Sequence, residues 1–223
     1  MSAVASTSDL PSPAVLLRAF LRVTLDDIVP KTRANVAAGS KVFGASVHRK
    51  APGLEVVTVG TNTETESPLL HGEIQTIQQF YQIPRDERPE ARDTVFFCTH
   101  EPCSLCLSGI TWGGWNVFYY LFTYEDTRDA FDIPHDINIL EQVFRVPSTC
   151  AHESSSDLAA RPLYNRSNAF FTSASCADLL AQVADDSPEK DELKALWQEV
   201  RSVYGELSGT YQANKGDKGI PMA

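Results

Sequence analysis

The stretches His71-Gly72-Glu73 and Pro102-Cys103-Ser104-Leu105-Cys106, about thirty residues apart, decide how this sequence is interpreted. Each is weak evidence alone, because a His-x-Glu pair often occurs by chance and a Cys-x-x-Cys pair can be structural or redox-active. Both, however, are expected at the start of a helix. Residues 71–82 carry apolar side chains on one helical face, and Pro102 lies near the first turn of another helix, where its missing N–H costs nothing. Together they bring potential metal ligands to two helix N-termini.

One imidazole and two thiolates from these stretches predict a catalytic zinc site. His71, Cys103 and Cys106 supply three protein ligands for tetrahedral zinc and leave the fourth position for water. Zinc lowers the pKa of bound water from about 15.7 toward about 7. Glu73, two positions from His71, does not share its helical face, so we expect Glu73 to carry the proton of that water. Two alternatives stay open: an oxidised Cys103–Cys106 pair, and a structural zinc with a fourth ligand from Cys98, His100 or Cys150.

The order of apolar patterns predicts a layered α/β domain. We expect a helix over 13–38 interrupted at Pro30, a hairpin with strands 42–47 and 54–59, and a helix over 71–82. A buried strand over 94–99, a helix from Pro102 and a strand over 117–122 follow. Beyond Thr123 the pattern weakens, and we expect helices over 136–146, 173–184 and 187–207.

Length and composition predict one globular domain. The 223 residues, 43% of them hydrophobic and 22% charged, are interpreted as a disordered tail (1–12), a single domain (13–210) with a helical extension from about 136, and a mobile tail (211–223). Because no stretch approaches the roughly 20 apolar residues of a membrane span, we expect no membrane partner. Five cysteines without a secretion signal fit metal ligation in the cytoplasm.

The charge balance bears on the substrate. A formal net charge of −10 gives the molecule a negative field that repels a phosphate backbone, and no Lys/Arg-rich patch is visible in the sequence. This favours a small neutral or cationic substrate over nucleic acid. The alternative is that the acidic composition only maintains solubility.

Three segments between residues 39 and 123 resemble known zinc enzymes. The stretch from Thr99 to Trp112 resembles the Glu-Pro-Cys-x-x-Cys-x-x-x-Ile-x-Trp pattern of guanine deaminases and bacterial tRNA adenosine deaminases, which belong to the cytidine deaminase-like superfamily. Phe43-Gly44-Ala45 resembles the Pro-Phe-Gly-Ala strand of these families, and Gly60-Thr61-Asn62 resembles their Gly-x-Asn segment.

The resemblance implies a three-layer α/β/α fold with a mixed five-stranded sheet, here with extra C-terminal helices, and a homodimer. It implies hydrolytic release of ammonia from an amino-substituted nitrogen heterocycle, such as guanine or a related nucleobase or nucleoside, by attack of zinc-bound hydroxide. It also implies that Asn62 hydrogen-bonds the substrate and that Phe43 and Trp112 form walls of its pocket. The alternatives are a left-handed turn for Asn62 and ordinary core packing for the two aromatic residues.

The sequence departs from the family pattern in three places. Gly72 replaces the usual Ala or Pro, Val42 replaces the Pro before Phe43, and the chain beyond Tyr124 resembles no family segment. Selective substrate contacts are therefore sought among seven residues that could otherwise form a surface loop: Tyr124, Glu125, Asp126, Phe131, Asp132, His135 and Asp136. Two other functions remain in competition, namely a deaminase of adenosine in tRNA or another nucleic acid, and an inactive zinc-stabilised binding module.

Overall fold

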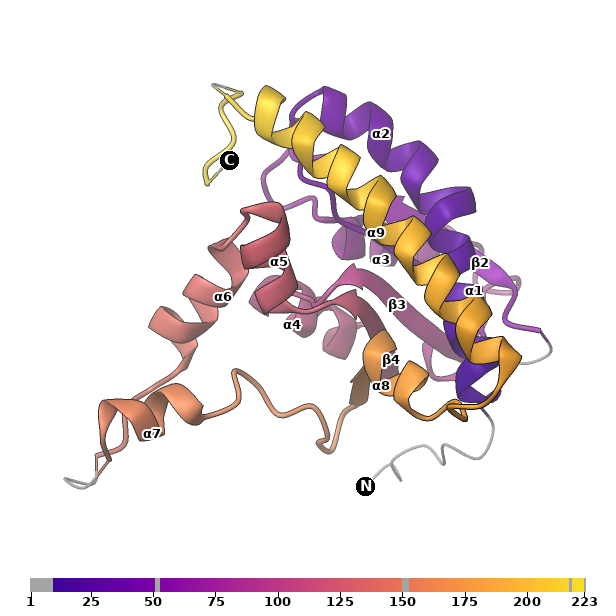
Figure 1. Ribbon diagram of the computed structural model, residues 1–223. Coiled ribbons are helices and arrows are strands. Elements are labelled where there is room, and N and C mark those ends of the chain that lie inside the picture. Colours follow the sequence, from indigo (N-terminus) through magenta and orange to yellow (C-terminus); the bar gives the residue numbers. More distant parts are fainter. Residues whose placement is uncertain (1–9, 51–52, 150–152, 217, 223) are drawn as a thin grey trace.

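The core of the molecule is a mixed five-stranded sheet with the strand order β2-β1-β3-β4-β5 (Figure 1). The computed structural model describes residues 10–50, 53–149, 153–216 and 218–222. The strands are β1 (Gly44–Arg49), β2 (Val56–Thr61), β3 (Thr94–His100), β4 (Val117–Phe122) and β5 (Thr172–Ser175). β1 is antiparallel to β2 and β3, whereas β4 is parallel to β3 and β5. The predicted mixed five-stranded sheet is confirmed.

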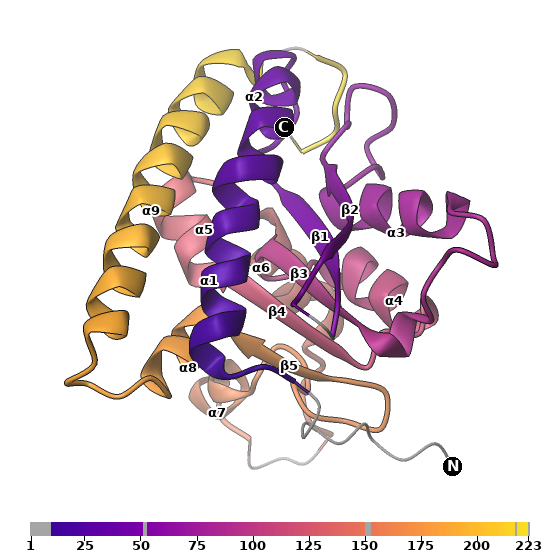
Figure 2. The ribbon, with the colours of Figure 1, turned by 90° about the vertical axis from the view of Figure 1, so that its right-hand side faces the viewer.

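Helices cover both faces of this sheet (Figure 2). One face carries α3 (Gly72–Gln82) and α4 (Ser104–Trp112), and the other carries α1 (Pro13–Val23), α2 (Val29–Ala37), α8 (Cys176–Ala181) and α9 (Pro188–Asn214). Along β3, Val95 and Phe97 pack toward the second set of helices, while Phe96 and Cys98 pack toward the first. Burial on both faces explains why the central strands are apolar without interruption. The three-layer α/β/α architecture is confirmed.

The N-terminal helices form one nearly continuous rod. A π-helical turn, η2 (Thr24–Ile28), joins α1 to α2 immediately before Pro30, which lies in the first turn of α2. Pro30 lacks an N–H, and this disfavours regular α-helical hydrogen bonding at that point. The predicted interruption therefore takes the form of a local widening of the helix.

The C-terminal half contains more elements than its sequence predicted. After β4 come α5 (Tyr124–Phe131), α6 (His135–Ile139), the π-helical turn η4 (Leu140–Phe144) and α7 (Ser155–Ala160). In the N-terminal half, a short 3₁₀ turn, η3 (Ala91–Asp93), precedes β3. The helix predicted over 136–146 corresponds to α6 and η4. The segment 124–136, which holds the seven residues considered as a possible surface loop, is largely helical, because Thr123 and Asp126 form a capping box that starts α5.

The helix predicted over 173–184 is wrong in its first part. Residues Thr172–Ser175 form the edge strand β5, and α8 begins only at Cys176. The tetrapeptide Thr-Ser-Ala-Ser has little of the apolar and aromatic character of a strand, so its pairing with β4 is decided by tertiary contacts. Ser175 and Asp178 then form the capping box that starts α8.

The last helix is longer than the predicted span of 187–207. α9 continues to Asn214 and buries Tyr211, so it enters the segment 211–223 that was expected to be a mobile tail. Beyond it, Ile220 is also buried. Of the predicted N-terminal tail (1–12), residues 1–9 lie outside the described residues, as do residues 217 and 223. Ser12, the last residue of that tail, caps α1.

Among the helices of the described chain, none has the length and apolar character that a membrane span requires.

Candidate metal centre and substrate cavity

The three predicted metal ligands converge where two helices begin. His71 is the N-cap residue of α3, Cys103 is the N-cap residue of α4, and Cys106 lies in the first turn of α4. β3 ends at His100, just before α4, and its neighbour β1 begins at Gly44 on the same edge of the sheet. The positive ends of two helix dipoles therefore point toward the cluster, where they favour thiolate and other anionic groups.

The separations between these side chains fit a tetrahedral zinc site. His71 Nδ1 lies 3.4 Å from Cys103 Sγ and 3.7 Å from Cys106 Sγ. Bond lengths of about 2.3 Å for Zn–S and about 2.0 to 2.1 Å for Zn–N, at a tetrahedral angle, place sulfur and nitrogen ligands about 3.6 Å apart. All three ligand atoms lie within 4.8 Å of one another. The donor set and its spacing thus fit zinc, with Nδ1 as the ligand atom of His71.

Within the described ranges, no fourth protein ligand joins the cluster. Cys98 and His100 are both buried but are not part of the metal-binding group, and Cys150 lies outside the described residues. Cys103 and Cys106 are free thiols, so the alternative of an oxidised pair is not the state seen here. The hydrogen bond from Cys106 lowers the pKa of the Cys103 thiol, although burial opposes this, and His71 lowers it further. A thiolate is the form that binds metal.

Glu73 lies beside the cluster without belonging to it. Its side chain is buried, with 4% of the residue exposed, and the Cys106 thiol donates a hydrogen bond of 3.3 Å to Oε2. Burial, assisted by the charge of Cys103, raises the pKa of Glu73 to about 7. A carboxyl group with a pKa near neutrality can both accept and release a proton, which is the property required of a general acid–base.

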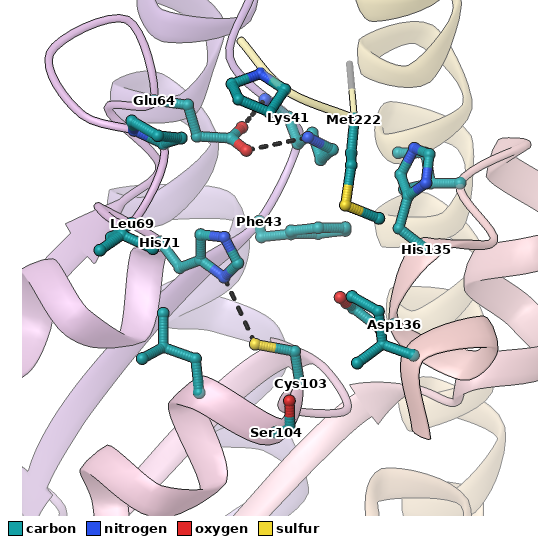
Figure 3. A pocket seen from close by; sticks show the side chains of 15 residues that line it. Lys41, Phe43, Glu64, Leu69, His71, Cys103, Ser104, His135, Asp136 and Met222 are labelled. Carbon is teal, nitrogen blue, oxygen red and sulfur yellow. Dashed lines mark hydrogen bonds and ion pairs between the residues drawn. The ribbon is translucent and has the colours of Figure 1, made fainter. Parts of the chain in front are cut away.

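A cavity of about 330 Å³ opens onto His71 and Cys103 (Figure 3). Phe43 lies across its middle, as its predicted role as a wall requires, and Asp136 faces the cluster from the opposite side to His71. Among the described residues, the side chain of Asp136 has no hydrogen-bond or ion-pair partner, and burial raises its pKa to about 8. The remaining lining residues are Lys41, Glu64, Pro68, Leu69, Ser104, Leu105, Ile133, His135, Ile139, Pro221 and Met222.

Of the seven C-terminal candidates for substrate contact, His135 and Asp136 line the cavity. Lys41, Glu64 and Met222 line it as well, but sequence reasoning did not identify them. Glu64 belongs to the Thr-, Glu- and Ser-rich stretch 61–67, which is typical of a solvated loop. The available signal was its position two residues after Asn62, the last residue of a motif that already pointed to the site.

The structure does not place Asn62 or Trp112 on this cavity. Asn62 is completely buried behind it, with Nδ2 donating to Glu64 and Oδ1 accepting from Gly72, and its φ is not positive, so the left-handed turn is excluded. Trp112 stands at the far end of α4 with 91% of its surface exposed. It is neither core nor cavity wall within this chain.

Residues 29–121 match the family model described as the cytidine and deoxycytidylate deaminase zinc-binding region. No curated protein matches the chain. Similar solved structures include a guanine deaminase from Nitrosomonas europaea, at 18% identity and a TM-score of 0.44 over 91% of this chain and 99% of that one. A guanine deaminase from Bacillus subtilis has 20% identity and a TM-score of 0.42 over 54% and 76% of the two chains. A structure from work on A-to-I editing by tRNA:A34 deaminases has 17% identity and a TM-score of 0.40 over 70% and 98%.

Proposed function

From the match of residues 29–121 to the zinc-binding region of cytidine and deoxycytidylate deaminases, we propose that this chain is a zinc-dependent hydrolytic deaminase. Its substrate is a small amino-substituted nitrogen heterocycle, with guanine and related purines as the first candidates. The observation that carries the proposal is that His71, Cys103 and Cys106 could hold zinc, with no fourth protein ligand among the described residues, beside the buried carboxyl group of Glu73. A purely structural zinc site does not need that carboxyl group.

The chemistry requires water to replace an amino group on a ring carbon. His71, Cys103 and Cys106 would hold zinc, which would activate water at neutral pH when bound. Attack of the water forms a C–O bond, and the C–N bond then breaks. Glu73 takes a proton from the water and passes it to the departing nitrogen, which leaves as ammonia. Its raised pKa, near 7, suits both steps.

Two further residues are positioned to hold the substrate ring. Phe43 offers an aromatic surface inside the cavity, against which a planar heterocycle can stack. The unpaired carboxyl group of Asp136 can accept a hydrogen bond from a ring N–H or an amino group, and burial makes such a bond more valuable. A substrate contact by Asn62 is not part of the proposal, because both ends of its amide are bonded to the protein.

A small molecule suits the site better than nucleic acid. A cavity of about 330 Å³ is of the size that holds a small ligand, and the net charge of −10 repels polyanions. The thiol ligands need a reducing compartment, for which we propose the cytoplasm.

We further propose that the chain forms a homodimer through the face that carries Trp112. Leu105, seven positions earlier on the same helix, is also an exposed large apolar residue, with 38% of its surface accessible. Trp112 borders surface hollows on two sides, one beside Tyr81 and one beside Phe171. Trp and other aromatic residues are enriched at protein interfaces. A monomeric mass in light scattering at micromolar concentration would reject this arrangement.

The test of the function is an ammonia-release screen on the zinc-loaded protein. Guanine, adenine, cytosine, cytidine, adenosine, pterins, aminotriazines and an unmodified tRNA are assayed, with the Glu73→Gln variant as the control for contaminating activity. We expect turnover of at least one free heterocycle that the variant does not support. Turnover only of a tRNA substrate would replace the small-molecule assignment, and no turnover of any compound by a zinc-loaded protein would favour a binding module.

A further inference from the structure

The metal centre occupies the position from which α3 would normally be capped. The first four N–H groups of a helix have no partner within the helix, and a Ser, Thr, Asp or Asn at the N-cap usually accepts from one of them. In α3 the N-cap residue is His71, whose ring faces Cys103 and whose side chain makes no capping hydrogen bond. The start of α3 therefore needs an acceptor from elsewhere in the chain.

Asn62 supplies this acceptor from the end of β2. Its Oδ1 accepts a hydrogen bond of 2.6 Å from the backbone N–H of Gly72, the first residue of α3, which lies between His71 and Glu73. Asn62 is 0% exposed, so water does not compete for this bond. The other end of the amide is equally fixed, because Nδ2 donates to Glu64 Oε2 at 3.0 Å.

Glu64 in turn is held by Lys41. The Lys41 backbone N–H donates to Glu64 Oε2 at 2.7 Å, and its ammonium Nζ donates to Oε1 at 2.9 Å. Both side chains are almost completely buried, with 8% and 2% exposed. Burial opposes ionisation of Glu64, but the charge and hydrogen bonds of Lys41 outweigh it and lower the pKa of Glu64. Figure 3 shows the pair at the end of the cavity away from Cys103.

We propose that Lys41, Glu64 and Asn62 form a positioning relay that caps α3 in place of His71 and so holds His71 and Glu73 in their metal-site geometry. The relay rests on the zinc site of the proposed function but not on turnover. Its members are positioning residues, because they act on the site through Gly72, and in the described structure no hydrogen bond joins them to the side chains of His71, Cys103 or Cys106.

The chemistry of the relay explains why its middle residue is an amide. The two ends of an amide offer an acceptor to Gly72 and a donor to Glu64 from one side chain. A carboxylate at position 62 could still accept from Gly72, but it would repel Glu64 across the same 3.0 Å gap. The backbone at Gly72 packs closely against that at Gly44, because a Cβ built on Gly72 would lie 2.7 Å from Gly44 Cα. Small displacements of this turn are therefore transmitted to β1.

The test compares zinc affinity in purified, folded variants by competition with a chromogenic chelator. Partners that orient metal ligands typically contribute 10- to 100-fold to metal affinity. We expect Asn62→Ala and Asn62→Asp to weaken zinc binding by about that range. The absorption spectrum of the Co²⁺-substituted protein should shift in both variants.

Thr94→Val is the matched control. It removes a buried acceptor that Trp115 Nε1 uses at 2.8 Å, at the opposite end of β3 from the cluster. It should lower the melting temperature without changing zinc affinity or the Co²⁺ spectrum. If the position 62 variants behave like this control, the relay only stabilises the fold and the proposal is overturned. If they lose zinc affinity in a protein that releases no ammonia from any substrate, the relay stands and the proposed function fails.

Discussion

His100 makes the stability of this protein depend on pH in a predictable direction. Its ring is buried in an aromatic shell, with centroid distances of 4.5 Å to Phe43, 5.0 Å to Phe122 and 5.5 Å to Tyr204. Nδ1 lies 3.0 Å from the hydroxyl of Thr99, and Nε2 is buried with no partner in the described structure. Because burial disfavours the charged form, the pKa of His100 falls from 6.5 to about 3.

The sign and size of the effect follow from proton linkage. Between pH 6.5 and 3 the unfolded chain binds a proton at this histidine and the folded protein does not, so the free energy of unfolding falls as the pH is lowered through 6.5. At about 1.4 kcal/mol per pH unit below 6.5, a change from pH 7 to pH 5 removes about 2 kcal/mol. Above pH 7 His100 is neutral in both states, so none of this stability is lost.

Replacement of His100 by Phe isolates this contribution. Phe retains an aromatic ring within the shell, and Thr99 keeps its bonds to the Gly44 backbone, so we expect little loss of stability at pH 7. Urea unfolding at pH 7 and pH 5 gives, for each protein, the change in the free energy of unfolding on acidification. Subtracting the change in the variant from that in wild type cancels zinc release and all other titrating groups. The variant should lose about 2 kcal/mol less than wild type on acidification. Equal losses would refute the argument, and loss of zinc from the variant would revive His100 as a fourth ligand.

Three more substitutions test the site and the fold. Glu73→Gln should keep zinc and folding but lower turnover about 10² to 10⁴-fold, because an amide cannot carry the proton, and activity within a few-fold of wild type would contradict this role. Cys106→Ser should reduce zinc from one ion per chain toward none, as measured by elemental analysis, and full occupancy would argue against the ligand set. Gly72→Ala should destabilise the protein by about 1 to 3 kcal/mol, because the new Cβ meets backbone atoms of β1. Its control, Gly205→Ala within α9, has open space at the new Cβ and should be neutral or stabilising by up to about 1 kcal/mol, as differential scanning calorimetry can check.

The elements that the sequence predicted well are those whose side chains are buried on both faces. β3 and β4 are uninterrupted apolar runs because each face contacts a helical layer, and such runs between turn signals are easily recognised. β5 escaped recognition because an edge strand of Thr, Ser and Ala owes its conformation to β4. His71, Cys103 and Cys106 could be proposed as zinc ligands from the sequence because their spacing is chemically specific and independent of distant contacts.

The polar surroundings of the ligands were harder to predict for a related reason. Lys41 and Glu64 are 23 positions apart, and each alone resembles an ordinary surface charge. Only the folded arrangement brings them together and buries them. The resemblance implied a pocket wall for Trp112, whereas in this chain its side chain is exposed at the far end of α4, so its role stays a prediction.

The buried acids around the cluster indicate how metal binding and protonation are coupled. Burial raises the pKa of both Glu73 and Asp136, and the thiolate of Cys103 raises them further. A doubly charged cation held by His71, Cys103 and Cys106 would offset the repulsion between the Cys103 thiolate and the two carboxylates. Its binding should therefore release protons from the site, and its affinity should increase as the pH rises. Because ligand bound to the folded state adds stability by mass action, the stabilisation by zinc should also increase with pH. The His100 effect has the same sign, so only the comparison with His100→Phe separates the two.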